Sequence, residues 1–245
     1  MVSNRYRPMS SARTDTLAAM DWASITRALL QAGFALTPRI LSSQECETLV
    51  DEYGQHTKFR MTINMEQFNF GRGEYKYFAY PLPPLVQNLR EELYARLAEA
   101  ANVWSERLGL GRRYPFKIDE LLSQCKKQNQ RRPTPLMLKY EEGDFNCLHQ
   151  DLYGELFFPF QVVFGLSRPG ADYQGGEIIL VQQRPRMQSV PHVINLSQGH
   201  AVIFAVNFHP QSGKRGYFRT SMRHGVSQVT RGRRFTLGII FHDAK

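Results

Sequence analysis

The spacing of apolar residues divides the chain into a helix-rich first half and a strand-rich second half. From Asp15 to Leu30, apolar residues recur at roughly helical spacing, and Gly33 is a suitable stop for that helix. A longer stripe, with apolar residues four positions apart, begins at Leu85 and predicts a helix to about Leu108. We expect both helices to bury one apolar face against a core.

Two shorter signals lie between these helices. Ser42 and Glu45 form a capping-box pattern that opens another helix, so residues 34–53 are predicted to be a short strand followed by a helix. Residues 59–84 are unusually aromatic and fit no helical period, which favours a loop or hairpin. Two interpretations of these rings remain open: they pack onto the core, or the loop overhangs an active site and stacks a planar substrate.

After residue 135 the pattern changes to short apolar runs broken by glycine and proline. Many short strands at such intervals predict a β-sandwich or barrel. The expected strands are Leu136–Tyr140, Phe157–Leu166, Glu177–Gln182, Val193–Leu196, Ala201–Val206, Gly225–Val229 and Arg234–Phe241. The predicted fold class is therefore α+β. A helical N-terminal region, residues 1–130, would pack on a barrel core, residues 131–245, in one compact domain overall.

The residues with the clearest chemistry lie at the end of an early barrel strand. In an extended strand, residues two positions apart project to the same side, so His149 and Asp151 could face one metal ion. His224, on a late strand, could complete the set. Two histidines and one carboxylate with open positions are typical of non-heme Fe(II) oxygenases. Alone, the His-x-Asp pattern is a weak motif, because many chains contain it by chance.

A cationic residue follows on the last predicted strand. Arg234 lies ten residues after His224 and shares its strand face with Thr236, whereas Arg233 would point to the opposite face. A guanidinium buried in a barrel needs a partner, and a carboxylate is its natural bidentate one. If the iron cosubstrate is a dicarboxylate, Arg234 would hold its far end, and Tyr140 could donate a hydroxyl to the same molecule.

Other polar residues are weaker candidates. Asn146 and Gln161 could line the pocket, and the loop with Arg184, Arg186 and Met187 could either contact substrate or simply be solvated. The remaining histidines are expected to be surface or structural residues: His56, His192, His200, His209 and His242.

The charge of the chain indicates which partners it could bind. The chain has 31 Lys and Arg against 22 Asp and Glu, a formal charge of +9, which favours polyanions such as nucleic acid. Because the cations are spread widely, with denser spots at residues 112–113, 126–132 and 231–234, a solvated basic surface remains an equal alternative.

The expected compartment is the cytoplasm, without a membrane partner. The chain has three cysteines without CxxC spacing, and it shows no secretory signal and no apolar span of ~20 residues.

These motifs together resemble the Fe(II)/2-oxoglutarate-dependent dioxygenases. The stretch Tyr140-x-x-Gly143 to Leu148-His149-Gln150-Asp151 resembles the AlkB-type DNA repair enzymes. The turn at residues 175–177, the strand at residues 199–204 and the spacing from His224 to Arg234 resemble the prolyl-hydroxylase-like branch instead. Across most of its length the chain is similar to a bacterial family described as 2-oxoglutarate/Fe(II) oxygenases acting on damaged DNA. The segments that carry this similarity are NCLHQDLYGE, QRPRMQS, MRHGVS and GIIFHDA.

The resemblance implies a double-stranded β-helix with His149, Asp151 and His224 as both metal ligands and catalytic centre. It also implies Arg234 as the 2-oxoglutarate anchor, beside Tyr140 and Thr236. The cofactors would be Fe(II) and 2-oxoglutarate, with dioxygen as cosubstrate and ascorbate as a candidate reductant. The chain departs from the AlkB pattern at two positions, Leu138 in place of Asn and Ile240 in place of a second Arg, so cosubstrate binding need not copy that branch.

Three functions stay open at this point. The first is hydroxylation of a substrate C–H, with oxidative demethylation of alkylated nucleobases in damaged or single-stranded nucleic acid preferred, because of the basic charge and the aromatic segment. The second is hydroxylation of a prolyl or other amino-acid side chain, which the strand spacings favour. The third is a non-catalytic barrel that binds nucleic acid through its basic surface.

Overall fold

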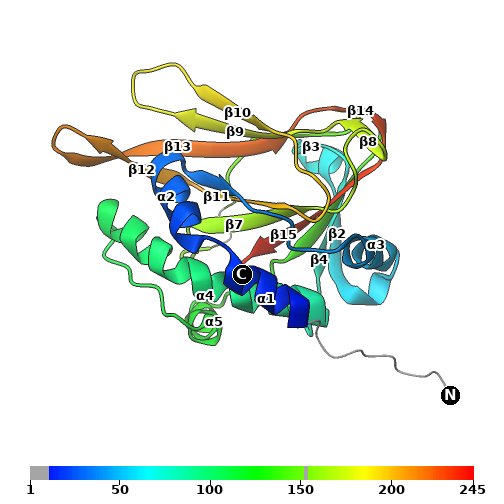
Figure 1. The fold of residues 1–245 in the computed structure, drawn as a ribbon, viewed down its shortest axis with the longest axis horizontal. Coiled ribbons are helices and arrows are strands. Elements are labelled where there is room, and N and C mark those ends of the chain that lie inside the picture. Colours follow the sequence, from blue (N-terminus) through cyan, green and yellow to red (C-terminus); the bar gives the residue numbers. More distant parts are fainter. Residues whose placement is uncertain (1–10, 152–153) are drawn as a thin grey trace.

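The computed structural model describes residues 11–151 and 154–245, and its two sheets stack above a layer of helices (Figure 1). The helices are α1 (Ser11–Ala19), α2 (Trp22–Ala32), α3 (Ser43–Glu52), α4 (Pro84–Arg107) and α5 (Ile118–Lys127). Two 3₁₀ turns, His56–Lys58 and Met65–Phe68, flank the second strand.

The larger sheet has seven strands. In spatial order they are β1 (Phe34–Leu36), β11 (Ala201–Ala205), β7 (Phe160–Gly165), β15 (Arg234–Ile240), β5 (Leu136–Tyr140), β4 (Glu74–Phe78) and β2 (Phe59–Asn64). Every neighbouring pair is antiparallel. Most neighbours are far apart in sequence, so the sheet is assembled from both halves of the chain.

The smaller sheet faces it. Its strands are, in order, β10 (Val190–Ile194), β9 (Ile178–Gln183), β13 (Gly216–Val226), β6 (Phe145–His149) and β3 (Gly71–Arg72), with β12 (Phe208–Gly213) paired to β13. A short ribbon of β8 (Tyr173–Gly175) and β14 (Val229–Gly232) closes one end. Two facing antiparallel sheets with these crossovers are a double-stranded β-helix, the predicted α+β fold.

Strand alternation gives the larger sheet two different faces. On β15, Arg234, Thr236 and Gly238 line an internal cavity, whereas Leu237 and Ile239 belong to the hydrophobic core on the other face. Successive strand residues point to opposite faces, which explains this division. One face of the sheet therefore serves the cavity and the other serves folding.

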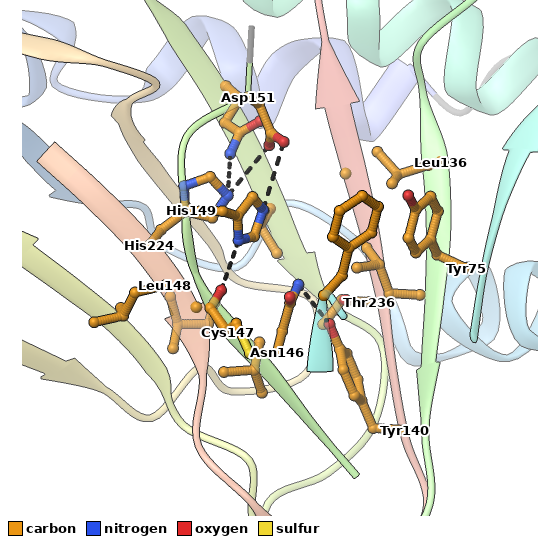
Figure 2. Close-up of a pocket in the computed structure, with 18 of the residues that line it drawn as sticks. Tyr75, Leu136, Tyr140, Asn146, Cys147, Leu148, His149, Asp151, His224 and Thr236 are labelled. Atoms are coloured by element: carbon orange, nitrogen blue, oxygen red, sulfur yellow. Dashed lines mark hydrogen bonds and ion pairs between the residues drawn. The ribbon is translucent and has the colours of Figure 1, made fainter. Parts of the chain in front are cut away.

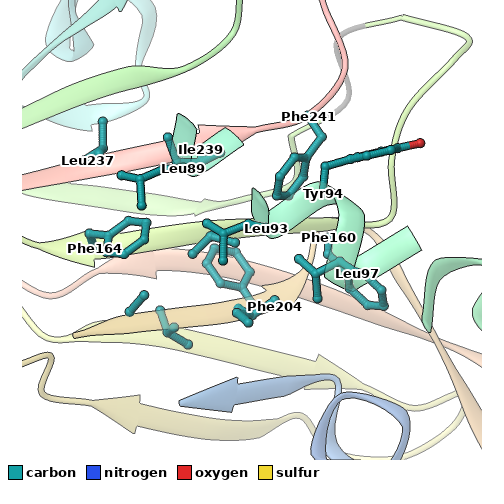
Figure 3. Packing of buried hydrophobic residues seen from close by; sticks show 14 of the residues in the cluster. Leu89, Leu93, Tyr94, Leu97, Phe160, Phe164, Phe204, Leu237, Ile239 and Phe241 are labelled. Atoms are coloured by element: carbon teal, nitrogen blue, oxygen red, sulfur yellow. The ribbon is translucent and has the colours of Figure 1, made fainter. Parts of the chain in front are cut away.

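Helix α4 covers the core face. Its stripe of Leu89, Leu93 and Leu97 is fully buried and packs against the strands of the larger sheet, including Phe164 and Ile239 (Figure 3). Burying each such leucine contributes roughly 1.5–3 kcal/mol. The predicted helix from Leu85 to Leu108 is thereby confirmed, and its role is to support the sheet that carries the cavity.

The shorter helical predictions are confirmed with one change. Ser42 and Glu45 make the reciprocal capping-box hydrogen bonds at the start of α3. Gly33 ends α2 with a left-handed φ of 82°. The stretch from residue 15 to 30 is two helices rather than one, because Asp21 caps the start of α2 by accepting from the Ser24 N–H.

The region before residue 130 is less helical than predicted. It contributes β1, β2 and β4 to the larger sheet and β3 to the smaller one. Helix α5 is an addition, because its ten-residue amphipathic pattern was not among the predicted helices. The division at residue 130 stays a prediction, but strands from both sides of it share hydrogen bonds.

Within the described ranges, 11–151 and 154–245, no helix combines the length and apolar character needed to cross a membrane. The three cysteines are free thiols, with Cys46 and Cys125 buried and Cys147 exposed.

Candidate metal centre

His149 and Asp151 are positioned by strand β6 and the residue that separates them. His149 ends β6, and Asp151 follows two residues later. Gln150 points to the neighbouring strands, where its amide donates to the carbonyl of Met222 and the side chain of Asn207, each at 2.9 Å. These bonds fasten the chain between the two ligands, so both side chains turn to the cavity.

His224 is brought to the pair by strand β13. Its Cα is registered directly opposite that of His149 in the ladder between β13 and β6. Asp151 lies between the two imidazoles, 3.5 Å from His149 Nε2 and 3.2 Å from His224 Nε2 (Figure 2). The three ligand atoms all lie within 4.8 Å of one another. The predicted group is therefore assembled from residues 73 positions apart, at a spacing that one ion could bridge.

Hydrogen bonding sets the tautomer of His149. Its Nδ1 lies 2.8 Å from the carbonyl oxygen of Cys147. Because a carbonyl only accepts, Nδ1 carries the proton, and Nε2 presents its lone pair toward Asp151 and the cavity. Metal-binding histidines are typically oriented in this way.

Burial and mutual contact prepare the carboxylate as a ligand. Burial raises the pKa of Asp151, but the contacts with His224 and His149 more than offset it and hold that pKa well below its usual range. Burial lowers the pKa of His224. Burial also opposes charge on His149, yet the hydrogen bond to Asp151 leaves its pKa raised. An ionised carboxylate and neutral imidazoles are the forms that bind metal, so an ion would compete with a proton chiefly at His149.

The group opens onto a cavity of about 360 Å³ between the two sheets. Arg234 lies in its wall, 2% exposed, and its Nε and Nη1 atoms are buried without a hydrogen-bond partner among residues 11–151 and 154–245. The guanidinium lies over the rings of Tyr140 and Tyr173, at 5.4 and 5.9 Å from their centroids. A buried cation with unpaired donors is costly unless an anion pairs with it, so the cavity is suited to an acidic ligand.

One glycine makes room for this arginine. Gly176 has a φ of +66°, and a Cβ at that position would lie 2.8 Å from Arg234 Cδ. A side chain there would be strained and would displace the guanidinium.

Tyr140 and Thr236 line the same cavity, and Arg233 does not. Asn146 donates to the Tyr140 hydroxyl at 3.3 Å. Burial raises the pKa of that phenol to about 12, so at neutral pH its O–H can donate to a ligand. Arg233 is exposed and pairs with Glu141 at 3.3 Å. The alternation argument for Arg234 over Arg233 agrees with this placement.

Asn146 and Gln161 also line the cavity. The Gln161 amide lies 3.1 Å from His224 Nε2, a contact that a bound ion would replace.

Two of the other histidines are buried outside the cavity lining. His242 accepts a hydrogen bond from the Phe158 N–H, and His209 faces Gln182. Tyr173, beside Arg234, was not predicted, because the pattern of a strand of only three residues is too short to recognise.

The aromatic segment, residues 59–84, was expected either to pack onto the core or to overhang an active site, and the structure shows some of its rings in each place. Tyr77 and Phe78 are buried. Tyr75 and Phe70 line the cavity, and Phe70 stacks on Phe68 with ring centroids 5.6 Å apart. Phe70 and Tyr75 therefore border the cavity, whereas Tyr77 and Phe78 pack in the core.

Comparison with known proteins gives one family. The family model described as "Oxygenase, catalysing oxidative methylation of damaged DNA" matches residues 73–244. Two relatives from Mycobacterium tuberculosis, the uncharacterized proteins MT2286 and Rv2227, are 45% identical over 167 residues, which cover 68% of this chain and 72% of each relative.

Solved structures show the same fold at low identity. A Pseudomonas putida prolyl-4-hydroxylase superposes with a TM-score of 0.56 at 13% identity, covering 91% of this chain and 99% of that one. A 2OG-Fe(II) oxygenase family oxidoreductase from Burkholderia pseudomallei gives 0.53 at 15% identity, covering 91% and 90%. The carbocyclase SnoK gives 0.54 at 13% identity, covering 93% and 86%. With the family model covering most of its length, the chain belongs to the oxygenase family described as acting on damaged DNA, and it is an oxidoreductase.

Proposed function

We propose that the protein is an Fe(II)- and 2-oxoglutarate-dependent dioxygenase that hydroxylates a C–H bond of a nucleobase in damaged DNA. One observation carries the proposal: a single cavity holds a His-Asp-His group at one place and an arginine with unpaired donors at another. A metal chelator with a free carboxylate at its far end satisfies both, and 2-oxoglutarate is such a molecule.

The residues present fit these two groups. His149, Asp151 and His224 would hold Fe(II) and leave other positions open. Arg234 would pair with the distant carboxylate through its Nε and Nη1 donors, and the Tyr140 hydroxyl and Thr236 would contact the same molecule. Bound Fe(II) supplies the oxidation by dioxygen that places a hydroxyl on the substrate carbon while 2-oxoglutarate becomes succinate and carbon dioxide.

The chain itself contributes orientation and exclusion of water. His149 is oriented by the Cys147 carbonyl, and the chain between His149 and Asp151 is held by Gln150, so these two ligands need little reorganisation on binding. The cavity wall beyond them is mainly apolar, with Leu136, Leu138 and Val163 among its residues. A substrate carbon held there faces the metal ligands away from bulk water.

Two observations favour a nucleobase as the substrate. The family is described by its action on damaged DNA. In addition, Phe70 borders the cavity and stacks on Phe68, and exposed aromatic rings of this kind hold unstacked bases. On an N-methyl group, hydroxylation would release formaldehyde and leave the demethylated base.

The test is succinate formation by protein loaded with iron under anaerobic conditions and then exposed to air. Parallel reactions contain methylated single-stranded DNA, a proline-rich peptide or no further substrate. We expect the DNA to stimulate turnover and to release formaldehyde. Stimulation by the peptide alone would move the protein to amino-acid hydroxylation, and absence of both iron binding and turnover would contradict the proposal.

A further inference from the structure

The positive charge of the chain is concentrated in one segment. Residues 178–242 contain nine Lys and Arg and no Asp or Glu. The rest of the chain has the other 22 Lys and Arg, which equal its 22 Asp and Glu. The whole formal charge of +9 therefore belongs to this acid-free segment, which contributes most of the smaller sheet.

Two hairpins of that sheet carry five of these nine cations. The β9–β10 loop holds Arg184 and Arg186, and the β12–β13 hairpin holds Lys214, Arg215 and Arg219. Strands β9 and β13 are hydrogen-bonded neighbours, and the two hairpins project side by side from the same end of the sheet (Figure 1). We call these five residues and the two turns that carry them the hairpin surface.

The cations of the hairpin surface lack acidic partners. Within residues 11–151 and 154–245, none of the five makes an ion pair within 4.0 Å. Two exposed arginines elsewhere are neutralised: Arg168 pairs with Asp172 at 2.7 Å, and Arg233 pairs with Glu141 at 3.3 Å. An unneutralised cluster of this kind attracts a polyanion.

Exposed aromatic rings lie among these cations. Phe208, Tyr217 and Phe218 are 38%, 47% and 39% exposed. The Arg219 guanidinium lies 5.8 Å from the centre of the Phe208 ring, and Arg107 lies 4.7 Å from that of Tyr217. Basic residues interleaved with aromatic rings suit a single strand, since its phosphates pair with the cations and its unpaired bases stack.

Strand β13 connects the hairpin surface to the candidate metal centre. It runs from Gly216 to Val226 and carries His224 near its end. At about 3.3 Å per residue, the nine positions from Arg215 to His224 span roughly 30 Å. Gln150, between two metal-ligand candidates, lies 3.2 Å from the Ser221 hydroxyl on the same strand. A bound polymer on the hairpins could thus present one residue to the cavity.

We propose that the hairpin surface binds single-stranded DNA and guides it toward the cavity. This inference rests on the proposed function for the identity of the substrate, and it adds the surface that receives the strand. The denser basic spot at residues 126–132 is not favoured, because Lys126 and Lys127 lie in the last turn of α5, where cations stabilise the helix end.

The test is binding of a fluorescein-labelled DNA single strand to the full chain, followed by anisotropy over a range of salt concentrations. The triple variant Arg186→Gln, Lys214→Gln, Arg215→Gln is compared with the control Lys126→Gln, Lys127→Gln, Arg131→Gln, which removes the same charge from exposed positions. We expect the hairpin variant to bind at least about tenfold more weakly at 0.1 M salt and to lose about 2 from the log–log salt slope. The control should bind like the unmodified chain.

Turnover of 2-oxoglutarate without DNA, measured on the same proteins, separates this inference from the proposed function. Normal turnover with unchanged DNA binding in the hairpin variant would overturn the inference and leave the proposed function standing. If the hairpin variant loses DNA binding and neither it nor the unmodified protein consumes 2-oxoglutarate, the inference is supported and the proposed function is contradicted.

A second variant, Tyr217→Ala with Phe218→Ala, tests the choice of partner. It should weaken binding of single-stranded DNA at least about fivefold and leave duplex DNA binding unchanged, because only unpaired bases stack. Tighter binding of duplex DNA, of RNA or of anionic lipid vesicles than of single-stranded DNA would overturn the assignment.

Discussion

Two buried arginines lie at opposite ends of β15, and their surroundings differ. Arg90, from α4, is fully buried beside the C-terminal end and donates to the carbonyls of residues 240 and 241, to Asp243 and to Tyr80. Arg234, at the other end, is 2% exposed and has two donors without a partner. Among the residues that the structure describes, Asp243 is the anion paired with Arg90, and no carboxylate pairs with Arg234.

This difference separates a structural cation from a ligand-binding one. A buried ion pair with all its hydrogen bonds made holds α4 and the C-terminus on the sheet. A buried guanidinium with unpaired donors lowers stability by itself and is retained where something else pairs with it. If this distinction is right, substitutions at the two positions should affect different measurements.

The largest effect is expected for Arg90→Leu. It leaves the Asp243 carboxylate buried without its cation, which should cost roughly 3–5 kcal/mol in the free energy of unfolding. Urea unfolding measures this loss. A change below about 1 kcal/mol would show that the pair is not the clamp described here.

Arg234→Met should act on the cosubstrate instead. Loss of a charged hydrogen-bond donor pair is expected to raise the 2-oxoglutarate concentration for half-maximal turnover about 10- to 150-fold, equivalent to roughly 1.5–3 kcal/mol. Urea stability should be unchanged or higher. Arg233→Met is the matched control and should change neither quantity, because its side chain is exposed and paired with Glu141.

A histidine near Arg90 should also determine part of the loss of folding stability at low pH. Burial, reinforced by the Arg90 charge, lowers the pKa of His242 to about 3. Below about pH 6.5 the unfolded chain takes up a proton here that the folded chain does not, so stability falls as pH falls through this window. From pH 7 to pH 5 this single group should cost about 2 kcal/mol.

The comparison variant is His242→Asn, which keeps an acceptor for the Phe158 N–H and cannot titrate. Its unfolding free energy should fall about 2 kcal/mol less than that of the unmodified chain between the two pH values. Equal losses in both proteins would mean that His242 is protonated in the folded state.

The smallest effect is expected for Tyr140→Phe. Removing one neutral hydroxyl from the cavity should raise the 2-oxoglutarate requirement about 2- to 13-fold, or roughly 0.5–1.5 kcal/mol. Tyr217→Phe, at the start of β13 and outside the cavity lining, serves as control when the same assay is run without DNA. An effect as large as that of Arg234→Met would show that the phenol, not the guanidinium, is the main anchor.

Strand alternation was enough to predict part of the site. It placed His149 with Asp151 on one side and Arg234 with Thr236 on one face, because a period of two needs no knowledge of the fold. The pairing of His224 with residues 73 positions earlier is different. The sequence offered His224 as a candidate and the resemblance supported it, but only the ladder between β6 and β13 explains its position.

Other features could not be read locally. Arg90 sits in a leucine-rich helix, and nothing near it in sequence shows that its partner is Asp243, 153 residues away. The strands before residue 130 were underestimated because their partners lie in the second half of the chain. The acid-free segment was accessible from the sequence, but it emerges only when acidic residues are followed along the chain together with basic ones.

The most direct test of the central claim is metal binding by the His149, Asp151 and His224 group. Equilibrium dialysis against Fe(II) under anaerobic conditions would compare the unmodified chain with Asp151→Ala and with Asp172→Ala, whose carboxylate instead pairs with exposed Arg168. We predict about one ion per chain for the unmodified protein and the Asp172 variant, and loss of binding for the Asp151 variant. Undiminished Fe(II) binding by Asp151→Ala would contradict the account.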